Sequence, residues 1–238
     1  MAASGPLDDA VIVAQWLYRF GTVPRSPAIE RDFGPDDDPM GVLGISVGGV
    51  VRRKLETAYE ASSFTGWYSF ARVPAHLRFA PACKLYVSPK PEALADAFPR
   101  IVHELVRSEV RSFKVGRGIE GLMRPDKIVA YFEERTHMDA VSRALQHALD
   151  GCPAQGVPFT TDVAGNGLLS SGIDPPAGEV AQSWRSWITA RLAGSLVTHR
   201  AFKGDDLVGR VLADLRTTEI DTKRWHPTAE TFRIASNV

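Results

Sequence analysis

The sequence predicts an α+β fold, in which a mostly antiparallel central sheet is flanked by helices and followed by C-terminal helices. Short runs of β-branched and aromatic residues alternate irregularly with amphipathic helical runs, a pattern that disfavours a doubly wound parallel sheet. The chain has 238 residues, of which 44% are hydrophobic and 24% charged. This composition is typical of a globular protein with a sizeable core.

Five short segments have the composition of strands. They are GWYSF (66–70), HLRFA (76–80), KLYVS (84–88), SFKVG (112–116) and KIVAYF (127–132). Each is rich in aromatic or β-branched residues or alternates between polar and apolar side chains. Prolines at 89 and 91 end the third segment.

Apolar residues at helical spacing predict the helices between and after these strands. The expected helices are 8–20, 92–107, 137–149, 178–198 and 204–216. Asp8 or Asp9 caps the first, and Pro99 interrupts the second. Trp184, Trp187, Ile188 and Leu192 form the apolar stripe of the fourth.

We expect three regions that together form one domain: an N-terminal helix and loop region (1–60), an α+β core (61–178) and a C-terminal helical region (179–238) packed on that core. The Pro- and Asp-rich stretch 22–40 reads as loop. The Gly-rich stretch 41–54 matches neither phosphate-loop glycine pattern, which argues against nucleotide binding there.

The charge balance excludes several classes of partner. The formal net charge is zero, with 28 basic and 28 acidic residues, so neither nucleic acid nor an anionic membrane is an expected partner. No apolar run is long enough for a membrane span and no signal peptide is visible, which predicts a soluble, cytoplasmic protein. Arginine outnumbers lysine and alanine is abundant, a bias typical of GC-rich bacterial genomes.

Metal and serine-hydrolase chemistry are disfavoured by spacing. The six histidines are scattered with no H-x-x-x-H pair, and two cysteines are too few for a zinc site. Cys83 should lie on the apolar side of its strand as a buried structural thiol. Ser170 and Ser171 are turn residues in this interpretation, because no G-x-S-x-G turn surrounds them.

The remaining chemistry lies in cations of the predicted sheet. Alternation places Lys84 and Tyr86 on one face of their strand and Lys114 opposite Phe113 and Val115. Lys127 and Tyr131 share a face of the last strand, and Arg117 and Arg124 flank the preceding turn. If these faces coincide, the cations form an anion site, and neighbouring ammonium groups lower a lysine's pKa. The alternative is a solvated sheet face with unrelated charges.

An ordered set of segments adds to this pattern. GWYSF, KLYVSP, SFKV, RPDKIVAYF, GVPFT and SGIDPP follow one another in an order and spacing that resembles the HopA-type effector-like family. The resemblance covers residues 66–177, with weaker agreement through SWRSWI. Its members include a plant-pathogen secreted effector and standalone bacterial proteins, and the family is regarded as a distant relative of the phosphothreonine lyases.

The resemblance implies a reaction. Peptide-modifying members work beside a kinase-like phosphotransferase in class V lanthipeptide and thioamitide pathways. They eliminate phosphate from phosphoserine or phosphothreonine of a ribosomally made precursor peptide, leaving dehydroalanine or dehydrobutyrine. The implied enzyme is a carbon–oxygen lyase without metal or redox cofactor, and its partners are the phosphorylated precursor and the phosphotransferase.

The resemblance also implies roles for individual residues. Lys84-Leu85-Tyr86 is similar to a lyase strand that supplies a phosphate-binding lysine and an acid histidine, so Tyr86 stands where the acid would be. Phe113-Lys114 is similar to the strand that supplies the base. Arg124 is implied to hold the phosphate. The cation pattern of the sheet adds Lys127 and Arg117 as candidate phosphate ligands, and Tyr131 and Thr160 are candidate substrate contacts.

Two alternatives stay open at this point. Tyr86 either protonates the departing phosphate or only orients it, since a phenol has a reference pKa of about 10; both Tyr86 and Tyr131 are also ordinary sheet aromatics. The whole chain is either the lyase or a non-catalytic module that binds a leader peptide or phosphopeptide with the same cations. The chain is alternatively a secreted effector that acts on host proteins.

Overall fold

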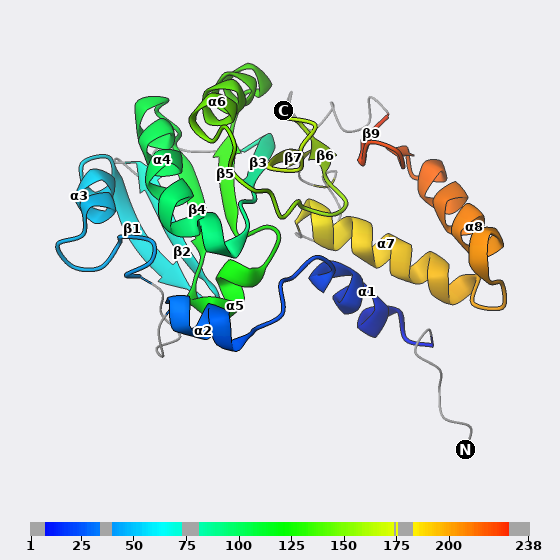
Figure 1. The fold of residues 1–238 in the computed structure, drawn as a ribbon. Coiled ribbons are helices and arrows are strands. Elements are labelled where there is room, and N and C mark those ends of the chain that lie inside the picture. The colour runs from blue at the N-terminus through cyan, green and yellow to red at the C-terminus, as the bar shows by residue number, and fades with distance from the viewer. Residues whose placement is uncertain (1–7, 34–39, 73–80, 174, 176–182, 229–238) are drawn as a thin grey trace. The chain divides into compact units, whose positions relative to one another are not determined.

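The computed structural model describes residues 8–33, 40–72, 81–173, 175 and 183–228 (Figure 1). Two compact units are distinguished. The sheet unit comprises residues 21–157 and 162–171, and the helical unit comprises 1–20, 158–161 and 172–238. This division groups the first helix with the C-terminal helices, whereas the sequence analysis expected residues 1–60 to form a region of their own.

The central sheet has the strand order β1-β2-β4-β5-β3-β7-β6 among the described residues. Its strands are β1 (Tyr59–Phe64), β2 (Trp67–Arg72), β3 (Cys83–Val87), β4 (Ser112–Gly116), β5 (Ile128–Phe132), β6 (Thr161–Asp162) and β7 (Leu169–Ile173). The pairs β1/β2, β2/β4, β4/β5 and β3/β5 are all antiparallel. The predicted α+β class is therefore confirmed. The expected strand 76–80 falls outside the described residues.

One face of the sheet is apolar and covered by helices. Cys83, Leu85, Phe113 and Phe132 lie on this helix-covered face and are buried. The helices α4 (Leu94–Arg107) and α6 (Arg135–Ala148) lie over the sheet in Figure 1. Their apolar stripes are fully buried, and α4 continues through Pro99. Burial also raises the pKa of the Cys83 thiol to about 11, as expected of a structural thiol.

The N-terminal part of the sheet unit holds elements that the sequence analysis missed. The expected loop 22–40 contains α2 (Pro27–Phe33), which starts with a proline, and the Ser26 hydroxyl accepts a hydrogen bond from the Ile29 amide. The Gly-rich stretch leads into α3 (Val50–Glu56). These helices are only seven residues long, so too few apolar positions repeat to reveal a helical period.

Two further short helices complete the sheet unit. The 3-10 turn η1 (Pro91–Ala93) leads into α4, and α5 (Gly118–Met123) connects β4 to the approach of β5. The predicted helix from about residue 92 is therefore confirmed, and its first turn is a 3-10 turn rather than an α turn.

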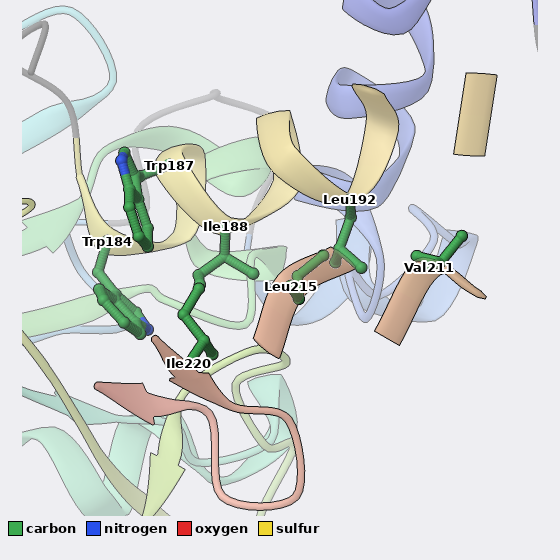
Figure 2. Packing of buried hydrophobic residues seen from close by; sticks show 7 residues of the cluster. All are labelled: Trp184, Trp187, Ile188, Leu192, Val211, Leu215 and Ile220. Atoms are coloured by element: carbon green, nitrogen blue, oxygen red, sulfur yellow. The ribbon is translucent and has the colours of Figure 1, made fainter. Parts of the chain in front are cut away.

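The helical unit has its own apolar core. It contains α1 (Ala10–Arg19), α7 (Trp184–Thr198), α8 (Gly204–Thr217) and a hairpin of β8 (Ile220–Asp221) and β9 (His226–Pro227). Asp9 caps α1 by accepting the amides of Val11 and Ile12. Figure 2 shows the predicted stripe of α7 meeting side chains of α8 and β8. The cluster consists of Trp184, Trp187, Ile188, Leu192, Val211, Leu215 and Ile220.

Candidate active site

The second face of the sheet carries the cations that the sequence analysis singled out. Lys84 on β3 pairs with Tyr131 on β5, and Tyr86 pairs with Val129. Val129 in turn pairs with Lys114 on β4. Because directly opposed residues of paired strands share a face, Lys84, Tyr86, Tyr131 and Lys114 lie on one side of the sheet. We call this side the cationic face.

The cationic face is not a solvated sheet surface. Lys84 is 9% exposed and Tyr86 is 3% exposed. Tyr86 belongs to a buried cluster with Trp67, Val129 and Val157, against which Tyr131 packs. A buried ammonium group loses hydration and must be compensated by partners. The interpretation as an ordinary wet sheet face therefore does not hold for these two residues.

Aromatic rings bring the cations together. The Lys84 Nζ lies 5.6 Å from the centroid of the Tyr131 ring, and the Lys114 Nζ lies 5.9 Å from the same centroid. The two ammonium nitrogens are therefore separated by no more than the sum of these distances. Lys114 also lies 4.0 Å from the centroid of the Trp67 ring. Cation–π attraction offsets part of the cost of burying these charges.

Arg124 joins the group through the same indole. Its guanidinium carbon lies 4.7 Å from the Trp67 centroid. Nε and one terminal nitrogen of Arg124 donate to the two carboxylate oxygens of Asp126 at 2.9 and 3.0 Å. This bidentate fork fixes the plane of the guanidinium. Arg124 is therefore oriented and partly buried, and it contacts the same indole as Lys114.

A close backbone approach positions Arg124. Gly116 ends β4 and pairs with Trp67, and Gly121 lies in α5 three residues before Arg124. A Cβ atom on Gly116 would collide with the carbonyl group of Gly121. Two residues without side chains thus let α5 pack directly against the end of β4.

The structure places Lys127 in contact with the loops that contain Pro89 and Gln155. Lys127 is fully buried, and its Nζ donates hydrogen bonds to the Pro89 carbonyl oxygen, at 2.8 Å, and to Gln155 Oε1. Burial lowers its pKa to about 7, although the carboxylates of Asp126 and Glu92 act in the opposite direction. Its observed contacts hold loops together, so it is not counted among the phosphate ligands below.

Arg117 is also not brought to the cations, and the role of Thr160 as a substrate contact stays a prediction. The Arg117 guanidinium lies 5.6 Å from the centroid of the Tyr68 ring. Tyr68 pairs with Val115 and so shares the opposite face of the sheet. Thr160 is buried in the segment 158–161, which belongs to the helical unit. Neither residue is carried into the site proposed below.

Trp67 is the residue that the sequence analysis missed. It was included in a predicted strand, but no role was given to it. The structure places its ring against both Lys114 and Arg124 while leaving it only 8% exposed. The available signal was its position: an aromatic residue that opens a strand next to a cation-bearing strand is a candidate partner for those cations.

Two further classes of site find no support in the described residues. No group of three or more His, Cys, Asp or Glu side chains among them is arranged to hold a metal ion. Within the same residues, no helix combines the length and the apolar character needed to cross a membrane.

Comparison with known proteins shows similarity at the level of the fold. No family model and no curated protein matches the sequence. The effector protein of Pseudomonas syringae pv. tomato strain DC3000 superposes with a TM-score of 0.56 at 12% identity, over 94% of this chain and 90% of that chain. The effector of Pseudomonas syringae pv. syringae strain 61 gives 0.53 at 12% identity, over 93% and 91%.

A third similar structure is that of OspF, a type III effector and phosphothreonine lyase of Shigella flexneri. It shares 11% identity and a TM-score of 0.42 over 66% of this chain and 86% of that chain. The fold of this chain is that of the Pseudomonas syringae effectors. At the level of the fold, this similarity to plant-pathogen effectors agrees with the resemblance stated in the sequence analysis.

Proposed function

We propose that this protein is a phosphoserine/phosphothreonine lyase that acts on a ribosomally made precursor peptide. The observation that carries the proposal is the convergence of Lys84, Tyr86, Lys114 and Arg124 around the rings of Trp67 and Tyr131. The sequence resemblance implies roles for the same four residues. Their proximity is what elimination of a phosphate group requires.

The reaction uses these residues in three roles. Lys114, as the neutral amine, removes the proton from Cα of the phosphorylated residue. The electron pair of that C–H bond forms the Cα=Cβ double bond, and the Cβ–O bond breaks with its electrons leaving on the phosphate oxygen. Lys84 and Arg124 stabilise the charge on the departing phosphate. The products are a dehydroamino acid and inorganic phosphate.

Tyr86 is the candidate proton donor to the leaving oxygen. It is buried on the same strand face as Lys84, two residues away. A neutral hydroxyl at this position either donates its proton or orients the phosphate through a hydrogen bond. In the second case the phosphate leaves without a proton, and the two cations carry the stabilisation alone.

The phosphorylated substrate must come from another enzyme. A kinase-like phosphotransferase that phosphorylates serine or threonine of the precursor would supply it, in the cytoplasm of a bacterium that makes a class V lanthipeptide or a thioamitide. Support for this setting comes from the sequence resemblance alone, because the similar solved structures are those of effector proteins, one of them a type III effector.

The test is direct incubation with phosphopeptides. Purified protein is mixed with synthetic phosphoserine and phosphothreonine peptides taken from short Ser/Thr/Cys-rich precursors in its own gene neighbourhood. We expect loss of phosphoric acid by mass spectrometry and a new thiol-reactive double bond, with the unphosphorylated peptides unchanged. If every phosphopeptide stays intact, the lyase proposal fails.

A second function is favoured by one observation. Lys114 is held against the indole of Trp67, an arrangement that favours the ammonium form over the neutral base. A non-catalytic module that binds a phosphopeptide with Lys84, Lys114 and Arg124 would use that charged form. It predicts phosphopeptide binding without turnover, and binding that persists when Lys114 is replaced by alanine.

A further inference from the structure

The strand β1 presents an open edge. It is the first strand in the sheet order, and among the described residues no strand pairs with its outer side. Residues 60–64 are exposed, whereas Tyr59 is buried. An open edge offers a row of main-chain N–H and C=O groups that another extended chain can pair with.

The sequence of β1 does little to block such pairing. Natural edge strands are protected by lysine, proline or bulges. The strand reads YEASSF and contains neither lysine nor proline; Glu60 is its single charged residue. Phe64 is 50% exposed and pairs with Trp67, so it lies on the cationic face.

A cavity lies beside this edge, on the other side of the sheet. Its volume is about 380 Å³. Its walls include Tyr59, Tyr68, Phe70 and Leu55 of α3. The Tyr59 hydroxyl donates to the carbonyl groups of Leu105 and Val110, so this phenol is already engaged with the protein interior. Aromatic and aliphatic side chains make up much of the lining, the small side chains of β1 leave room in it, and the ion-paired Arg52 and Glu56 of α3 also line it. Such a cavity suits an apolar side chain.

The register of β1 connects the edge to the cavity. Ala61 pairs with Phe70, and Ser63 pairs with Tyr68, so both small side chains point to the cavity side. Ser62 pairs with Ser69, and Phe64 with Trp67, on the cationic face. A chain paired with β1 would therefore alternate between the cavity on one side and the cationic face on the other.

We propose that β1 binds an extended segment of the substrate peptide that flanks the phosphorylated residue, by strand addition, and that an apolar side chain of this segment enters the cavity. The inference rests on the proposed function for the identity of the substrate. The paired chain lies three strand spacings from β4, about 14 Å at about 4.8 Å per spacing. The phosphorylated residue therefore lies outside the paired segment and reaches Lys114 by crossing the cationic face.

A second copy of this chain fits the edge less well. If two β1 strands paired symmetrically, each copy would present Tyr59, Ala61 and Ser63 on the cavity side. Ala61 and Ser63 are too small to fill a cavity of about 380 Å³, and Tyr59 is fixed by its two hydrogen bonds. A peptide with a bulky apolar residue fills it better.

The test measures binding with a fluorescein-labelled peptide. The peptide has a short run of alternating leucine and threonine, a Gly/Ser linker and one phosphothreonine. Two counterparts carry N-methyl groups on alternate residues of the run, one on the leucines and the other on the threonines. Each therefore lacks the main-chain N–H donors along one edge of the extended segment. Fluorescence anisotropy gives the affinities, and hydrogen exchange reports on residues 59–64.

We expect the unmethylated peptide to bind at least about tenfold more tightly than the weaker methylated form and to protect residues 59–64 from exchange. Ala61→Trp, which fills the cavity, should abolish the difference. Glu60→Trp is the matched control, because it adds the same bulk to the other face of the same strand; the difference should persist. Circular dichroism verifies that both variants fold.

Equal binding of all peptide forms would overturn the inference, as would an unchanged preference in Ala61→Trp. It is also overturned if sedimentation shows a dimer that Ala61→Trp dissociates, because the edge would then belong to a second copy. Failure of the proposed function is distinguishable, since it appears as tight, edge-dependent binding without loss of phosphate.

Discussion

The two faces of the central sheet are made by the same strands, but burial affects the free energy of folding in opposite directions on the two faces. On the helix-covered face, Phe70 and Phe113 stack with centroids 4.8 Å apart, and Tyr59 meets Phe113 edge-on at 5.3 Å. There, burial itself is the favourable term. On the cationic face, Lys84 and Lys114 lie against aromatic rings, where burial costs free energy.

The contrast between the two faces indicates which of them carries the function. A sheet needs one apolar face for stability, and the helix-covered face supplies it. Clustered, partly dehydrated cations contribute little to stability, because mutual repulsion and desolvation oppose them. Their clustering therefore supports the anion site proposed above. The following predictions test this separation of roles, beginning with the largest effect.

Lys114→Ala should reduce the elimination rate by about 10²- to 10⁴-fold, because general-base catalysis contributes effects of this size. The free energy of unfolding should change by less than about 1 kcal/mol, since the residue is only partly buried. Turnover is followed by phosphate release, and stability by urea unfolding. Lys90→Ala, which removes an exposed lysine, is the matched control and should retain full activity.

Phe113→Ala, on the neighbouring position of the same strand, should have the opposite profile. It removes a fully buried ring from the helix-covered face, which costs about 3–5 kcal/mol of unfolding free energy. The rate per folded molecule should stay near that of the parent, measured at a temperature where the variant is folded. A large loss of rate at unchanged stability would contradict the assignment of separate roles to the faces.

Tyr86→Phe distinguishes the two roles proposed for the phenol. If Tyr86 donates a proton, the rate should fall by about 10- to 100-fold, and Tyr86→His should recover part of it. If the hydroxyl only orients the phosphate, the loss should appear in KM and histidine should not help. Steady-state kinetics on one phosphopeptide separates the outcomes.

Lys127 should make stability depend on pH. Its pKa is lowered from 10.5 to about 7 in the folded protein, so between these values the unfolded chain binds a proton that the folded protein does not. Stability should therefore rise with pH across this window, by up to about 1.4 kcal/mol per pH unit. Lys127→Met should flatten the dependence in urea unfolding between about pH 7 and pH 10. A slope that survives the substitution would assign it to another group.

Trp67→Phe should have the smallest effect. Phenylalanine binds a cation less strongly than tryptophan, by up to about 1 kcal/mol, so the neutral form of Lys114 is reached more easily. The rising limb of the rate–pH profile should move to lower pH by less than about one unit. A shift to higher pH would show that the indole does not stabilise the ammonium form.

Much of the site could be predicted from the sequence because alternation along a strand is strictly two-residue. Lys84, Tyr86 and Lys114 lie where that period put them. Lys127 precedes the first residue of β5, and its partners Pro89 and Gln155 are remote in sequence, so no local pattern revealed its burial. Arg117 is the N-cap residue of α5, directly before Gly118. The φ of 73° at Gly118 takes the chain out of the strand, so two-residue alternation does not predict the direction of the Arg117 side chain.

The close approach of Gly116 and Gly121 has a consequence for how the site tolerates change. The position of Arg124 depends on the absence of a side chain at Gly116 and at Gly121. A single methyl group at either glycine would displace α5 and carry Arg124 with it. A substitution can thus disable the site while leaving every charged residue in the chain intact, so sequence comparisons restricted to the charged positions would overestimate the number of active relatives.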